Sequence, residues 1–208
     1  MFRVLTISRE YGSGGAEIGR DIAQRLGWRV LDKAFIDNIS RAVKVDPKLA
    51  RRFDECTDSW LERLRHGLWR GAFEGVAPVT QADFFNAETM AALSRNMIEE
   101  AHQQGKCVII GRGGQCVLHN RKDVLRVFIY APWDQRVACV GRRLPGETDI
   151  EGLVRSTDRR RTNYIRTYYR CNRVDSHLYH LMMNSALGKG LLISVILKVL
   201  AGASSARV

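Results

Sequence analysis

Short apolar runs alternate along this chain with longer stretches that carry an apolar face at helical spacing. The runs predict five strands, over residues 2–7, 28–31, 106–110, 124–130 and 178–183. The clearest helical pattern covers residues 15–26, where Ile18, Ile22 and Leu26 share one face and Gly27 is placed to end the helix. Strands that alternate with helices indicate an α/β fold, in which a parallel sheet is covered by helices on both faces.

One connection in this pattern is too long for a single crossover helix. Between the second and third strands, about 75 residues have no strand pattern, whereas a plain crossover helix needs only about 10–15 residues. We therefore predict a helical insertion over residues 33–105. Its helical stretches are residues 33–43, 47–53, 59–71 and 83–104.

A glycine-rich turn lies between the first strand and the first helix, and reads Ser-Arg-Glu-Tyr-Gly-Ser-Gly-Gly-Ala over residues 8–16. Glycines lack a Cβ atom, so backbone N–H groups can converge on an anion at a helix N-terminus. The helix dipole favours negative charge at the same place. The turn therefore predicts a phosphate site and indicates a nucleotide ligand.

The turn departs from both standard nucleotide-binding motifs. If Gly14 is the second glycine of the P-loop pattern G-x-x-x-x-G-K-[ST], then Arg9, Gly15 and Ala16 replace the first glycine, the lysine and the hydroxyl residue. The dinucleotide fingerprint G-x-G-x-x-G begins well but then has Glu17 in place of its third glycine. An ordinary tight turn between a strand and a helix remains the alternative.

Further polar residues follow the other predicted strands. In an open α/β sheet, ligands bind beyond the carboxyl ends of the strands. Asp32, the segment 111–114 and the pair 184–185 all stand at such ends. We therefore expect three distant segments to meet near the glycine-rich turn.

The charge of the chain favours an anionic partner. The net charge is +11 and the isoelectric point is near 9.9, which fit a polynucleotide, a mononucleotide or a phospholipid surface equally well. Tyr164, Tyr168 and Tyr169 stand among arginines, as in proteins that stack single-stranded nucleic acid. Binding of single-stranded nucleic acid would not explain the phosphate site that the glycine-rich turn predicts. The arginines gather in the second half of the chain: Arg136, Arg142, Arg143, Arg155, Arg159, Arg160, Arg161, Arg166 and Arg170.

The cysteines and histidines have neither disulfide nor zinc-site spacing, so we expect reduced thiols and no metal site built from side chains alone. No long apolar segment precedes the first strand, which argues against a secretory signal. The apolar stretch 191–200 is broken by Lys198 and is far shorter than the ~20 residues of a membrane span. We therefore expect a cytoplasmic protein without a membrane partner, with this stretch as a packing helix.

These segments together resemble the nucleoside monophosphate kinases, and most closely the cytidylate kinase-like family. The resemblance covers nearly the whole chain and depends on the order and spacing of several pieces. They are residues 7–15, 26–33, 108–113 and 128–132, the segment 158–161 with Tyr164, Tyr168 and Tyr169, and residues 183–185.

The resemblance implies a P-loop NTPase fold, a three-layer α/β sandwich with a five-stranded parallel sheet. It implies a single domain over residues 1–208, with core segments 1–32, 106–142 and 171–201. Residues 33–105 would form the helical monophosphate-binding insertion, and residues 143–170 the arginine-rich lid.

The resemblance also implies a reaction, in which ATP phosphorylates a nucleoside monophosphate, CMP or dCMP, to the diphosphate. Magnesium would be held mainly by the nucleotide phosphates. Such catalysis depends on positioning and charge stabilisation more than on a protein nucleophile.

This chain differs from ordinary cytidylate kinases at several important positions. Those enzymes have Gly-Ser-Gly-Lys-Gly-Thr in the turn and Gly-Arg-Asp after the third strand. Here the corresponding residues are 12–17 and 111–113, and the lysine, the hydroxyl and the aspartate are all replaced. A catalytically impaired nucleotide-binding regulatory protein is therefore the alternative to a kinase.

The resemblance assigns a role to each candidate residue. Asp32 and Arg112 would contact the acceptor nucleotide; the alternatives are a helix cap for Asp32 and a structural ion pair for Arg112. Arg9 or Arg20 would supply the missing cation. The donor phosphates would be held at Arg9, Gly12, Ser13, Gly14, Gly15 and Ala16. Candidate catalytic residues are Arg112, Arg142, Arg159 and Arg161, with Asp158 orienting one of these arginines. For the arginines of the lid, the alternative is a basic helix that is exposed to solvent and has no catalytic role.

Overall fold

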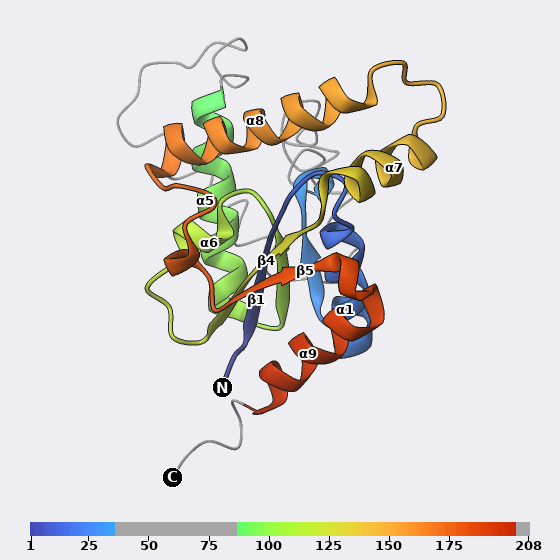
Figure 1. Ribbon diagram of the computed structural model, residues 1–208. Helices are drawn as coiled ribbons and strands as arrows, with labels where there is room; N and C mark the ends of the chain where they lie inside the picture. Colours follow the sequence, from blue (N-terminus) through green and yellow to red (C-terminus); the bar gives the residue numbers. More distant parts are fainter. Residues whose placement is uncertain (36–86, 203–208) are drawn as a thin grey trace, which may run out of the picture.

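A five-stranded parallel sheet forms the centre of the molecule in the computed structural model, which describes residues 1–35 and 87–202 (Figure 1). The strand order is β2-β3-β1-β4-β5, so the first strand lies in the middle. The strands are β1 (Val4–Arg9), β2 (Arg29–Leu31), β3 (Cys107–Ile110), β4 (Val124–Tyr130) and β5 (Leu181–Asn184).

The two faces of the sheet carry separate apolar clusters, because successive side chains of a strand point to opposite faces. Leu5 and Ile7 of β1 are fully buried with the alternate residues of β3 and β4 on one face. Val4 and Ile109 are buried on the other face. Burial on both sides is typical of a parallel sheet covered by helices.

Helices cover both faces and the carboxyl end of the sheet. The helices α1 (Gly15–Leu26) and α9 (Lys189–Gly202) pack on one face, and α5 (Ala87–Gln104) and α6 (Gly114–Val117) on the other. Figure 1 shows α8 (Ile150–Tyr169) lying across the end of the sheet, next to α7 (Trp133–Arg143). The predicted three-layer α/β architecture is confirmed.

Four predicted strands have different bounds in the structure: β2 and β3 begin one residue later than predicted, β1 two residues later and β5 three residues later. The strand predicted over residues 2–7 runs from Val4 to Arg9, because β4 is long enough to pair with its last two residues. The strand predicted over residues 178–183 begins only at Leu181. Before it, the Asp175 carboxylate accepts a hydrogen bond from the backbone N–H of His177 and caps a short 3-10 helix, η2 (Ser176–Leu178).

Most of the predicted insertion lies outside the described residues. The helices predicted over residues 33–43, 47–53 and 59–71 are almost entirely in that part of the chain. The helix predicted over residues 83–104 corresponds to α5, which starts at Ala87 and ends at Gln104 as predicted. Among residues 1–35 and 87–202, no helix is long and apolar enough to cross a membrane.

Candidate functional site

The glycine-rich turn connects the central strand to the first helix and presents unpaired backbone donors. Gly12 and Gly14 have φ angles of +86° and +74°, which glycine adopts without strain, and Gly14 is the N-cap of α1. No described residue accepts a hydrogen bond from the backbone N–H of Gly12, Gly14, Gly15 or Ala16. At a helix N-terminus, such a set of donors favours an anion.

Two glycines of this turn are in close contact with arginines. A Cβ atom on Gly12 would lie 2.6 Å from the backbone oxygen of Arg136 in α7. A Cβ atom on Gly15 would lie 2.7 Å from the Cβ atom of Arg9. Neither position therefore has room for a side chain.

Two open cavities lie on opposite sides of the turn. One, of about 420 Å³, faces β4 and β5; the other, of about 330 Å³, faces β3 and β2. The first is lined by residues that include Gly12, Gly14, Ala138, Arg142, Ser185 and Lys189. The second is lined by Arg9, Arg20, Asp32, Lys33, Ala34 and Ile110. A glycine-rich turn between two cavities can hold a phosphate chain that joins a ligand on each side.

Arg9 extends from the end of β1 toward the second cavity. Its Nη1 atom lies so close to Gly111 that a Cβ atom there would overlap it. Burial, and then the nearby charges of Arg161 and Arg173, lower the pKa of the Arg9 guanidinium, although Asp32 acts in the opposite direction. The site is therefore rich in positive charge.

Asp32 is held in place by hydrogen bonds in the second cavity. One carboxylate oxygen accepts a hydrogen bond from the backbone N–H of Phe35 at 3.0 Å, as a helix cap does. The other pairs with Arg20 at 3.0 Å. Burial alone would raise the pKa of Asp32, but the Phe35 and Arg20 hydrogen bonds outweigh it and lower that pKa. The helix-cap alternative considered for Asp32 is thus present in the structure, beside the cavity.

Arg112 follows β3 with a φ angle of +55°, between two glycines that also have positive φ. Its backbone oxygen accepts a hydrogen bond from the Tyr169 hydroxyl at 3.0 Å. A Cβ atom on Gly113 would overlap the Tyr169 ring. The end of α8 therefore packs directly on the turn that carries Arg112. Tyr164 also contacts Tyr168 and Tyr169, so the three tyrosines pack against one another.

Asp158 joins α8 to the glycine-rich turn. Its carboxylate accepts a hydrogen bond from the backbone N–H of Tyr11 at 3.0 Å and forms a short ion pair with Arg136. Arg173 lies 3.5 Å from the same carboxylate, and Arg161 lies 3.9 Å from it. The structure thus brings Asp158 and Arg161 together at the turn.

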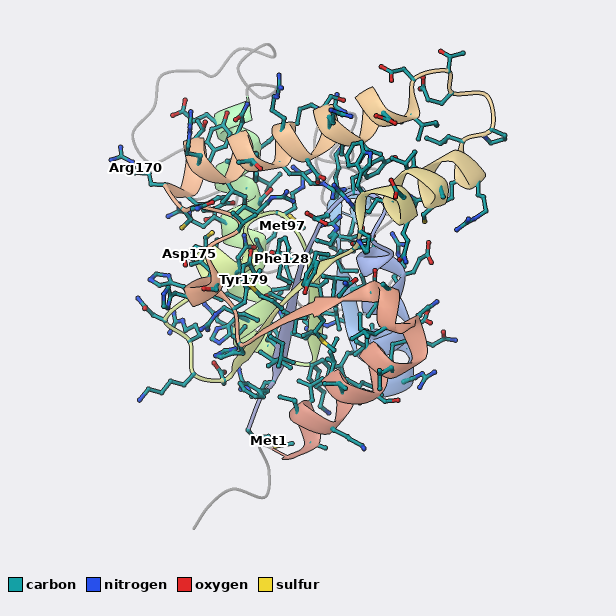
Figure 2. All side chains as sticks on the ribbon, viewed as in Figure 1. Met1, Met97, Phe128, Arg170, Asp175 and Tyr179 are labelled. Atoms are coloured by element: carbon teal, nitrogen blue, oxygen red, sulfur yellow. The ribbon has the colours of Figure 1, made fainter. Side chains whose placement is uncertain are left out.

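The backbone oxygen of Arg9 is held by α8 and by the segment that follows it. Arg161 and Arg173 donate hydrogen bonds to it at 3.1 and 3.0 Å. Arg173 is positioned in turn by Tyr179, whose hydroxyl donates to its backbone oxygen at 2.6 Å. Figure 2 labels Tyr179 beside Phe128, and the centroids of the two rings are 5.2 Å apart.

Sequence reasoning missed three residues of this network. Arg136 is 8% exposed and also lies 3.4 Å from Glu10, whose carboxylate accepts a hydrogen bond from the N–H of Ala131. Arg173 is 6% exposed. One indication of Arg136 is present in the sequence, since this residue falls in the arginine-rich part of the chain. No such indication exists for Glu10 or Arg173, because their partners are distant in sequence.

The two other candidate arginines are not part of this network. Arg142 is exposed and lines the first cavity, beside the turn. Arg159 is exposed on α8 and forms no hydrogen bond or ion pair with a residue that the structure describes. The structure therefore does not bring Arg159 to the turn.

The side chains around the turn do not fit a magnesium ion held by the protein. Ala16 has no oxygen at the position of the P-loop hydroxyl, and the Ser13 hydroxyl donates to the backbone oxygens of Glu10 and Ile129. Asp32 is already paired with Arg20. Within residues 1–35 and 87–202, no group of three or more His, Cys, Asp or Glu side chains could hold a metal.

Comparisons with known proteins agree with this architecture. A model of the cytidylate kinase-like family matches residues 4–187. No curated protein matches the chain. Among solved structures, an uncharacterized protein from Eubacterium ventriosum is 20% identical with a TM-score of 0.69, and the match covers 97% of this chain and 99% of that one.

A second solved structure is shikimate kinase from Acinetobacter baumannii in complex with shikimate. It is 16% identical to this chain with a TM-score of 0.52, and the match covers 98% of this chain and 95% of that one. At such identities the two structures show a shared fold only. That fold has its ligand sites at the carboxyl ends of the strands, where the glycine-rich turn lies.

Proposed function

Because this chain belongs to the cytidylate kinase-like family, we propose that it transfers a phosphoryl group from ATP to a nucleoside monophosphate, CMP or dCMP. The observation that carries the proposal is the set of unpaired N–H groups of Gly12, Gly14, Gly15 and Ala16 between two cavities. Phosphoryl transfer needs a donor and an acceptor on either side of one phosphate group.

The first cavity is the better place for ATP. It reaches from the turn to Ser185 at the end of β5, and Arg142 and Lys189 provide positive charge there. Lys189 also pairs with Asp21 at 2.8 Å, on the outer side of α1. We assign the adenosine to this side and the phosphate chain to the turn.

The second cavity is then the acceptor side. Asp32 and Arg20 line it, and so does Ile110, two residues before Arg112. A guanidinium binds phosphate with two parallel hydrogen bonds, so Arg112 is our candidate for the phosphate of the monophosphate. Asp32 keeps acceptor capacity for a hydroxyl or amino group of the nucleoside.

The lid contributes charge on the remaining side. Arg161 contacts the backbone of Arg9 and the carboxylate of Asp158, so its guanidinium is held close to the turn. A fixed cation near a transferring phosphoryl group stabilises the charge that develops there. Magnesium would come with the ATP phosphates and neutralise part of their charge.

The test is an ADP-release assay with ATP and magnesium, screened against CMP, dCMP, UMP and AMP. We expect turnover with CMP or dCMP above the rate of ATP hydrolysis without acceptor. ATP binding without turnover on any of the four would exclude the proposal.

Such a result would favour the second candidate, a nucleotide-binding regulatory protein without phosphoryl transfer. The observation in its favour is that Gly15 and Ala16 stand where a P-loop has its lysine and hydroxyl. The two candidates differ in one measurement, because both bind ATP and only the kinase forms ADP in an acceptor-dependent way.

A further inference from the structure

Arg9 fills the space beside position 15, where a P-loop would have its lysine. At position 15, a Cβ atom would lie 2.7 Å from Cβ and 3.3 Å from Cγ of Arg9, and 3.1 Å from Cβ of Ile129. The side chain of Arg9 thus starts where a lysine side chain at position 15 would start. Only glycine fits at position 15, because the Arg9 side chain occupies the space that a side chain at position 15 would need.

The other end of Arg9 is also closely fitted. The Nη1 atom of its guanidinium lies against the backbone of Gly111, where any Cβ atom would overlap it. Gly111 has a φ angle of +78°, so glycine is favoured there for conformation as well as for space. Gly15 and Gly111 together leave a channel for one long side chain that ends at the second cavity.

Arg9 forms no ion pair within the part of the chain that the structure describes, although the more distant Asp32, itself paired with Arg20, favours its charge. No carboxylate in residues 1–35 or 87–202 lies within 4.0 Å of its guanidinium. Its Nε atom is buried and has no hydrogen-bond partner. A largely buried cation without an ion-pair partner is costly, so an anion bound beside Arg9 would be favourable.

Arg20, the other candidate for the missing cation, is in a different situation. Its side chain is 55% exposed and pairs with the Asp32 carboxylate at 3.0 Å. Its charge is therefore already compensated, and water screens it. Arg161 and Arg173 are near, but each uses an Nη1 donor on the backbone oxygen of Arg9.

We propose that Arg9 takes the place of the P-loop lysine: its guanidinium, passed between Gly15 and Gly111, binds the phosphate chain of the nucleotide at the glycine-rich turn. In this chain the positive charge comes from Arg9, the last residue of β1, whereas a P-loop lysine would stand at position 15, the first residue of α1. This assignment deepens the proposed function and rests on it only for the identity of the nucleotide. Burial of Arg9 lowers its pKa, and a bound phosphate anion offsets that effect.

The test exchanges the cation between the two positions. Arg9→Met keeps the length of the side chain and removes its charge. Arg9→Gly with Gly15→Lys returns a cation from the position that a P-loop uses, because Arg9→Gly removes the Cβ and Cγ atoms that a side chain at position 15 would meet. Gly15→Lys alone places a lysine against Arg9. Arg25→Ala, an exposed arginine at the far end of α1, is the matched control.

The first measurement is binding of tripolyphosphate, a probe without a nucleoside, by calorimetry. We expect Arg9→Met to weaken binding by about ten- to a hundredfold, the size of a charge-assisted contact. The double variant should recover at least part of this loss, and Arg25→Ala should bind like the unchanged protein. Unchanged binding in Arg9→Met, or no recovery in the double variant, overturns the assignment.

Thermal unfolding separates a ligand-binding role from a structural one. If Arg9 serves the ligand, Arg9→Met removes an uncompensated charge and unfolds at the same temperature as the unchanged protein or higher. A Tm that falls in Arg9→Met while tripolyphosphate binding persists overturns the proposal in favour of a structural arginine. Turnover is measured separately, so absence of kinase activity with Arg9-dependent tripolyphosphate binding removes the proposed function and leaves this inference standing.

Discussion

Gly12 and Gly14 have similar backbone angles but different surroundings. Both lie in the left-handed region, where a residue with a Cβ atom is strained. A Cβ atom on Gly12 would meet the backbone of Arg136, whereas one on Gly14 would have no atom within 4 Å. A substitution at position 14 would therefore meet conformational strain alone, whereas one at position 12 would meet both strain and an overlap with the backbone.

We expect alanine to destabilise the protein more at position 12 than at position 14. Gly14→Ala should cost about 1–2 kcal/mol from strain alone. Gly12→Ala adds an overlap with backbone that cannot rotate away, for a total of about 2–5 kcal/mol. Urea unfolding measures both, and equal losses would mean that α7 yields freely at the contact with Gly12.

The residues of the turn could be predicted from the sequence, but the reason for their identity could not. Three glycines before a helical pattern indicate an anion site by themselves. That Gly15 lacks a side chain because of Arg9, and that Gly111 receives the guanidinium, depends on how β1, α1 and β3 meet in space. Periodicity along one segment carries no information on such contacts.

At the scale of the secondary-structure elements, the side chain of Asp158 joins α8 to the rest of the molecule. Asp158 is 17% exposed and is shared by the backbone of Tyr11 and the guanidinium groups of Arg136, Arg161 and Arg173. Helical spacing placed Asp158 and Arg161 on one face of this helix. It did not reveal Arg136 or Arg173, because those partners come from α7 and from the segment after α8.

We expect Asp158→Ala to destabilise the protein by about 3–5 kcal/mol, since it leaves the buried Arg173 without its carboxylate and Arg136 with Glu10 alone. Hydrogen exchange should show the loss first in α8. Glu151→Gln is the control on the same helix, where the exposed pair with Arg155 contributes less than about 0.5 kcal/mol. Protection of α8 that survives Asp158→Ala would show that its packing on α7 holds it in place without this carboxylate.

For the molecule as a whole, the parallel sheet and its cover of helices on both faces follow from features that sequence reasoning captures well, whereas the strand order was not predicted. Buried runs such as β3 and β4 predict a doubly covered parallel sheet directly. The exact bounds of β1 and β5 were missed because strand ends depend on the neighbouring strand, as with Arg9, the last residue of β1, opposite Ile129. Polar ties between layers, such as His102 with Asp123 at 2.9 Å, were missed for the same reason.

This His102 and Asp123 pair predicts an acid-sensitive contribution to stability. Burial alone would raise the pKa of Asp123, but the His102 hydrogen bond and the charge of Arg3 lower it. A carboxyl group with a lowered pKa stabilises the folded state above its unfolded pKa, and that contribution is lost as pH falls through the folded pKa.

Asp123→Asn should therefore cost no more than about 1 kcal/mol at pH 7, because the carboxylate is partly exposed. Below about pH 4 the difference from the unchanged protein should shrink toward zero. Urea unfolding over this pH range tests it, with Glu99→Gln, an exposed carboxylate on α5, as the control. A gap that stays constant or widens toward acid would contradict the assignment.

The position of β1 in the middle of the sheet has a consequence for how the chain is made. Its residues pair with β3 and β4: Val4 lies opposite Cys107 on one side and Val124 on the other, and both partners come much later in the chain. During synthesis the first apolar strand leaves the ribosome long before either neighbour exists. Contacts so distant in sequence slow folding and leave an unpaired strand exposed to aggregation. The arrangement that places the glycine-rich turn at the centre of the sheet thus makes the nascent protein a candidate for chaperone protection until β4 emerges.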